Sequence, residues 1–219
     1  MLKYVFFFCL FIIASCQQST ECQDPEGKCP AETSQVPVPL PGADPLPEDE
    51  ISNDALLFDA SVDFTNFDHG DEAKVLDAIR IIQEVVRSKE FRERVINFSY
   101  QGKRAFVDNG GLSNGQIYQM ILNGSEDLSV GVDHEMDLEL ELYTSKDNVV
   151  GYTYPNILKI YMNTKYFDVY TPTEVAGNIF HEWTHKLGFQ HSFRYSVARD
   201  ASVPYAIGYL IEELGKQYE

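Results

Sequence analysis

Residues 171–191 constrain the fold of this chain more than any other stretch, because they define where a helix begins, where it ends and what one face carries. Thr171, Pro172 and Glu174 fit the N-cap, first and third positions of a capping box. Apolar residues follow at helical spacing, and Gly188 is suited to end the helix. The sequence therefore predicts a helix of about 16 residues, roughly 24 Å long.

Three of the five histidines of the chain fall in this segment, as His181, His185 and His191. His181 and His185 are four residues apart, so both imidazoles project from one helix face and can reach a single ion. Gly188 lets the chain turn so that His191 can return as a third ligand. Three neutral nitrogens leave a fourth position open, which is typical of a catalytic zinc site. Glu182 is poorly placed as a ligand but can reach a water on the metal.

The segment HEWTHKLGFQH resembles the zinc-binding signature of the metzincin metallopeptidases, H-E-x-x-H-x-x-G-x-x-H. The resemblance covers every defining position, but only residues 181–191 of the chain. It implies that His181, His185 and His191 bind one Zn²⁺, and that Glu182 is the general base for a zinc-bound water that hydrolyses peptide bonds. It also implies a peptide or protein substrate and a zincin-like fold, with a long helix before a small mixed sheet, an edge strand that pairs with extended substrate, and an active-site helix.

The chain departs from this family after the third histidine, because no methionine follows Met162 to build the family's Met-turn. Residues 202–205, Ser-Val-Pro-Tyr, are the nearest counterpart and resemble the astacin-type turn, whose tyrosine serves the zinc site. By that resemblance Tyr205 is a candidate oxyanion donor, and the alternative is a tyrosine of the core or of a turn. A competing ligand set would take Glu212 or Glu213 as the third ligand, as in the Glu-zincins.

Helices and strands alternate elsewhere without a regular βαβ order, so the predicted class is α+β. The acidic face of the strand over 136–143, with Asp137, Glu139 and Glu141, either lines a cleft that favours basic residues or is a solvated face. Hydrophobic spacing predicts helices over 68–98 with a break near Ser88, over 113–123 and over 206–216, and strands over 104–108, 136–143 and 157–163.

The first residues predict an export signal. Residues 1–15 combine Lys3 with an apolar stretch too short to span a bilayer, which is typical of a secretory signal peptide. The segment Ile-Ala-Ser-Cys that ends at Cys16 resembles the bacterial lipobox, in which the cysteine is lipidated, and Gln17 resembles the pattern sorted to the outer membrane. We therefore expect an extracytoplasmic protein held on a membrane by its N-terminal lipid, or a secreted one if Cys16 is not lipidated.

Residues 16–50 are rich in proline and poor in large apolar residues, which predicts a disordered tether. Cys22 and Cys29 lie in this tether, and outside the cytosol they are expected to form a small disulfide loop. The alternative is that one thiolate plugs the zinc site. The folded domain is expected over residues 51–219.

The charge balance excludes one class of partner. The chain has 17 Lys and Arg against 34 Asp and Glu, a formal net charge of −17, and it has no basic run that could neutralise phosphates. We therefore expect no nucleic-acid partner. Besides the endopeptidase, two functions stay open: a zinc hydrolase of cell-wall peptide crosslinks, and a non-catalytic lipoprotein with a degenerate zincin fold. The sequence leaves the oligomeric state open.

Overall fold

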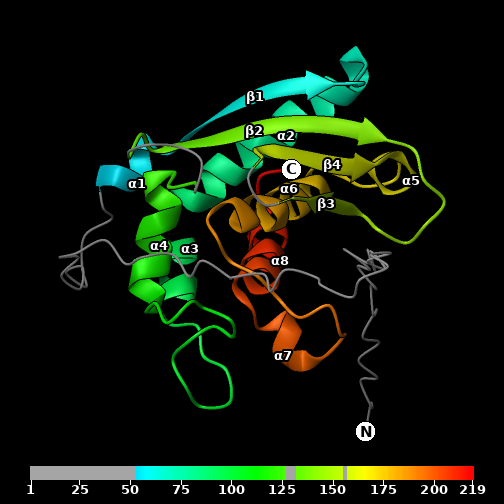
Figure 1. The fold of residues 1–219 in the computed structure, drawn as a ribbon. Helices are drawn as coiled ribbons and strands as arrows, with labels where there is room; N and C mark the ends of the chain where they lie inside the picture. Colours follow the sequence, from blue (N-terminus) through cyan, green and yellow to red (C-terminus); the bar gives the residue numbers. More distant parts are fainter. Residues whose placement is uncertain (1–52, 127–131, 155–156) are drawn as a thin grey trace, which may run out of the picture.

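The computed structural model describes residues 53–126, 132–154 and 157–219, which form a four-stranded sheet and several helices (Figure 1). The strands are β1 (Asp59–Thr65), β2 (Glu135–Tyr143), β3 (Gly151–Thr153) and β4 (Lys159–Asn163). The helices are α1 (Asn53–Leu57), α2 (His69–Val86), α3 (Lys89–Ile96), α4 (Asn114–Asn123), α5 (Thr164–Phe167), α6 (Pro172–Lys186), α7 (Val197–Asp200) and α8 (Val203–Gly215).

The sheet is mixed, with strand order β1-β2-β4-β3. β1, β2 and β4 run parallel, with Val62 opposite Leu138 and Leu140 opposite Ile160. β3 is antiparallel to β4 and forms one edge of the sheet. A parallel neighbour requires a crossover connection, and α2, α3 and α4 supply it between β1 and β2.

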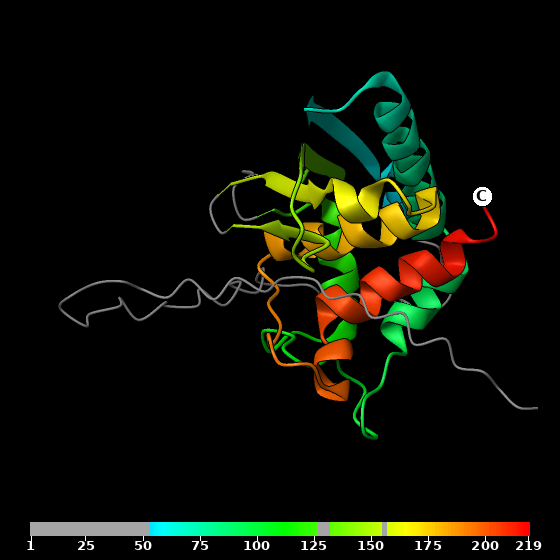
Figure 2. The same cartoon turned by 90° about the vertical axis from the view of Figure 1, so that its right-hand side faces the viewer.

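The core lies between the sheet and the helices α2, α6 and α8. Figures 1 and 2 show α2 and α6 against one face of the sheet, with α8 packed beyond α6. The strand residues that point toward these helices alternate with outward polar residues, as expected for a sheet that is covered on one face. In β2 the buried residues are Met136, Leu138, Leu140 and Leu142.

Most of the predicted helices are confirmed because their caps are local. Asp68 and Asp71 form the capping box of α2, and Ser88 is the N-cap of α3 at the expected break. Ser113 caps α4. The predicted combination of helices with a small mixed sheet is confirmed at this level.

Other boundaries were wrong. The strand expected over 104–108 does not form, and Val107 makes only an isolated bridge to Ser202. The last helix begins at Val203 instead of residue 206, so Tyr205 lies in its first turn and not in a turn before it. The last strand begins two residues later than expected, and β1 and β3 were not predicted.

None of the described helices is both long enough and apolar enough to cross a membrane. The predicted signal peptide, the lipidation site Cys16, the tether and its Cys22 and Cys29 all lie outside the described residues. They stay predictions.

Candidate metal centre

α6 positions the first two histidines. It begins at a capping box in which Thr171 Oγ1 accepts from Glu174 N and the Glu174 carboxylate accepts from Thr171 N, as predicted. After its last residue the chain reverses at Gly188, whose φ of 89° lies in the left-handed region that glycine favours. This reversal brings His191 back toward the helix.

The three predicted histidines converge. His181, His185 and His191 each offer a ligand atom, and these atoms lie within 4.8 Å of one another. The Nε2 atoms of His181 and His191 are 3.3 Å apart. Two nitrogens that bind one tetrahedral ion at about 2.05 Å are separated by roughly 3.3 Å, so this pair already has the required spacing.

Backbone carbonyls fix the orientation of all three rings. His185 Nδ1 is 2.7 Å from Phe189 O, His191 Nδ1 is 3.1 Å from Ser192 O, and the His181 ring bonds to the Pro204 backbone. A carbonyl oxygen can only accept, so these ring nitrogens carry the protons and the opposite nitrogens keep their lone pairs. Metal-ligating histidines are commonly held in this way.

Burial keeps the three rings neutral. It lowers the pKa of His185 to about 3, with the neighbouring His191 adding to the shift. Burial is also the main cause that lowers the pKa of His181 and of His191. A neutral imidazole is the form that binds a metal, so the chemistry of this donor set fits a metal ion. The group could therefore hold one.

Glu182 lies beside this group without taking part in it. Its side chain is fully buried, and neither carboxylate oxygen has a hydrogen-bond partner among the described residues. Burial raises the pKa of Glu182 to about 8, while the charge of Lys186 lowers it. A buried carboxylate without partners is costly, and such groups are concentrated at functional sites.

Lys186 was not predicted as a site residue. Its Nζ donates to the backbone carbonyls of Tyr154, Ile157 and Lys159, so it ties α6 to the β3–β4 connection. One sequence pattern could have predicted that Lys186 lies near the site: it follows Glu182 by four residues, and residues at this spacing share a helix face.

α8 supports His181 from behind. A Cβ atom at Gly208 would lie 3.0 Å from Gly177 O and 3.1 Å from His181 Cβ, so a larger residue there would have to push α6 and α8 apart by a few tenths of an ångström. The ring of Tyr205 lies 4.5 Å from that of His181 and 4.6 Å from that of His191. The structure thus brings Tyr205 to the site, and its role as an oxyanion donor stays a prediction.

The competing third ligands lie on α8, where Glu212 lines a small pocket together with His181 and Tyr205. Glu213 is exposed and pairs with Arg94 at 2.9 Å, and Glu212 lies 3.8 Å from Lys216. Neither belongs to the histidine group of the described residues. Phe180 and Trp183 are fully buried in the core, as expected for packing residues of α6.

Glu126 is hydrogen-bonded to Trp183 of α6, and the sequence contained no pattern that predicted this contact. Its Oε1 accepts from Trp183 Nε1 at 2.5 Å and from Asp137 N at 3.0 Å. Burial raises the pKa of Glu126 to about 7, although both hydrogen bonds lower it. The carboxyl group is thus protonated in the folded protein at mildly acidic pH.

This group should make stability fall as pH rises. The pKa of Glu126 is higher in the folded protein than its ordinary value of 4.5. The contribution of Glu126 to the free energy of unfolding is therefore fully present below pH 4.5, and it is lost as the pH rises from 4.5 to about 7. A tenfold change in proton affinity is worth about 1.4 kcal/mol, so the loss is on the order of 3 kcal/mol. Glu126→Gln should be more stable relative to wild type at pH 7.5 than at pH 4.5 by that amount.

Urea unfolding of both proteins across this pH range measures the difference. Trp183→Phe removes a hydrogen bond that lowers the pKa of Glu126. In that variant the loss of stability with rising pH should therefore continue to a higher pH than in wild type. A difference between Glu126→Gln and wild type that does not change with pH would contradict the prediction.

No protein-family model matches the chain, and no curated protein matches its sequence.

Proposed function

We propose that the protein is a zinc-dependent endopeptidase with a zincin-like fold, held outside the cytoplasm on a bacterial membrane by a lipid on Cys16. The observations that carry the proposal are the three converging, neutral histidines and, next to them on α6, the buried carboxylate of Glu182, which has no hydrogen-bond partner among the described residues. Imidazole nitrogens suit zinc among the common divalent ions, and three of them leave a position for substrate. His181, His185 and His191 would hold the ion.

Zinc at this position would supply Lewis acidity toward the scissile carbonyl group. Glu182 would take the proton of the attacking water at a carboxylate oxygen and pass it to the leaving amine. The base must both accept and return a proton, and burial, which raises the pKa of Glu182, makes its carboxylate a stronger proton acceptor than an exposed one. The buried surroundings of Glu182 keep bulk water from competing for it.

The sheet edge supports a peptide substrate. β3 pairs only with β4 among the described strands, so its other side is an edge. β3 also contacts α6, which carries His181 and His185 (Figure 1). An extended peptide can add to such an edge through main-chain hydrogen bonds. This would place the peptide bonds of a substrate close to the three histidines.

Zinc content and peptide hydrolysis, measured on the same sample of the full chain, test the proposal. We expect about one zinc per chain by elemental mass spectrometry, and cleavage of a mixed peptide library that stops on chelation and returns with added zinc. A chain that binds no zinc would contradict the proposal. Bound zinc without cleavage would favour a non-catalytic lipoprotein, and cleavage of purified cell wall alone would favour a crosslink hydrolase.

A further inference from the structure

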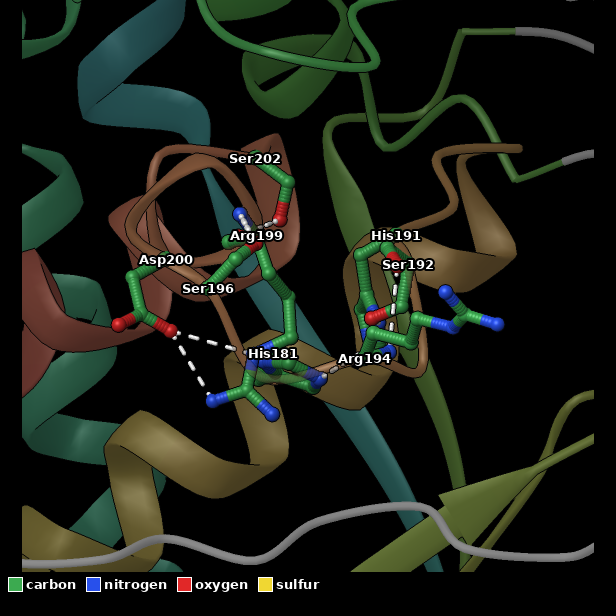
Figure 3. Close-up of polar contacts among 8 residues, drawn as sticks. All are labelled: His181, His191, Ser192, Arg194, Ser196, Arg199, Asp200 and Ser202. Atoms are coloured by element: carbon green, nitrogen blue, oxygen red, sulfur yellow. Dashed lines mark hydrogen bonds and ion pairs between the residues drawn. The ribbon is translucent and has the colours of Figure 1, made fainter.

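Arg199 is a buried cation beside the histidine group, and nothing above gives it a role. Its side chain extends from α7 toward His181 (Figure 3). It is only 6% exposed. The guanidinium carbon lies 4.3 Å from the ring centre of Tyr205 and 4.6 Å from that of Tyr195. The planar cation is therefore in contact with two aromatic rings.

Neighbouring residues fix the Arg199 side chain and backbone. Asp200 Oδ1 accepts from both Nε and one Nη of Arg199, at 3.2 and 3.0 Å. Ser196 Oγ accepts from Arg199 N, and Ser202 Oγ donates to Arg199 O (Figure 3). A side chain with this many contacts has little freedom, so the ring of Tyr205 rests on a fixed support.

Tyr205 transmits this support to two of the three histidines. Its ring contacts those of His181 and His191, as described above. The residue before it, Pro204, supplies the backbone hydrogen bond of the His181 ring. Residues 195–205 therefore contact two of the ligand rings, in the part of the chain where the Met-turn is missing.

Electrostatic attraction does not explain a cation at this position. A positive charge close to the histidines repels a metal ion, and the ion pair of Arg199 with Asp200 offsets this repulsion without turning it into attraction. Its benefit to the site must therefore be geometric and must outweigh this repulsion.

We propose that Arg199 is a positioning residue, which stacks on Tyr205 and thereby holds His181 and His191 in the arrangement that binds a metal ion. The proposal rests on the metal site of the proposed function but not on its peptidase activity. It predicts that Arg199 favours metal binding although its charge opposes it.

Cobalt(II) binding to the full chain tests the proposal, because its visible absorption reports ligand geometry. We expect Arg199→Met to raise the dissociation constant for Co²⁺ by about 10- to 100-fold, the usual effect of losing a group that orients a ligand, and to change the spectrum. Arg199→Lys should also change it, because lysine keeps the charge but lacks the planar group that stacks. Arg194→Met is the matched control: it removes an exposed charge near His191 and should leave the spectrum unchanged.

A double-mutant cycle tests whether Arg199 acts on the histidines through Tyr205. If Arg199 acts through Tyr205, then Arg199→Met should have little further effect on the dissociation constant in a Tyr205→Leu background. Additive effects would overturn this route. An Arg199→Met variant that binds Co²⁺ as tightly as wild type, with the same spectrum, would overturn the proposal.

Two further outcomes are decisive. If Arg199→Met fails to fold by circular dichroism, Arg199→Lys decides, and a wild-type spectrum and affinity in that variant would overturn the proposal. A wild-type chain that binds cobalt but cleaves no peptide would contradict the peptidase while leaving this test intact. A wild-type chain that binds no cobalt would overturn both.

Discussion

Glu182→Gln is expected to lower the turnover of peptide substrates by about 10²- to 10⁴-fold while the metal stays bound, because a general base contributes a factor of this size. Glutamine has nearly the shape of glutamate and fits the same buried space, but its amide cannot accept the proton of the attacking water. The side chain is not one of the three ligands, so the metal should remain. Replacing this buried carboxyl group with an amide of the same shape should also leave the fold intact.

The measurement is kcat on a cleaved peptide together with metal content in the same sample. Glu174→Gln is the matched control, since it makes the same chemical change on the same helix, at the capping box and away from the histidines. It should keep wild-type turnover, because glutamine also serves in a capping box. Full activity in Glu182→Gln would show that another group accepts the proton, and loss of metal would show that Glu182 is a ligand.

The local parts of the fold were predictable from the sequence. α6 was correct at both ends because Thr171 and Glu174 cap one end and Gly188 reverses the chain at the other. The spacing of His181 and His185 then placed both rings on one face, and the structure adds His191 to the group. The helix ends and the pairing of His181 with His185 depend on residues within about one helical turn of one another, which is the range over which a sequence pattern is informative.

The parts that depend on distant contacts could not be predicted in this way. β1 alternates polar and apolar residues, but it becomes a strand by pairing with β2, more than seventy residues later. The segment 104–108 had the composition of a strand and found no strand to pair with. The link between Glu126 and Trp183 likewise depends on tertiary folding, and so does the contact of Tyr205 with the histidines.

The third ligand shows the same difference between local and distant information, because the sequence left His191 in competition with Glu212 and Glu213. The structure separates them: His191 Nε2 faces His181 Nε2 at 3.3 Å, while Glu213 pairs with Arg94 on the surface. We therefore expect His191→Ala to weaken zinc binding by about 100-fold or more, since losing even a group that orients a ligand costs 10- to 100-fold.

Competition with a chromophoric chelator measures this loss in the full chain, with Glu213→Ala as the control. That control breaks only an exposed ion pair, which is worth about 1 kcal/mol or less, so its zinc affinity should equal that of wild type. If His191→Ala instead kept zinc while Glu212→Ala or Glu213→Ala lost it, the last helix would supply the third ligand. Gly188 would then have no part in the site, because the reversal that it allows serves to return His191 to α6.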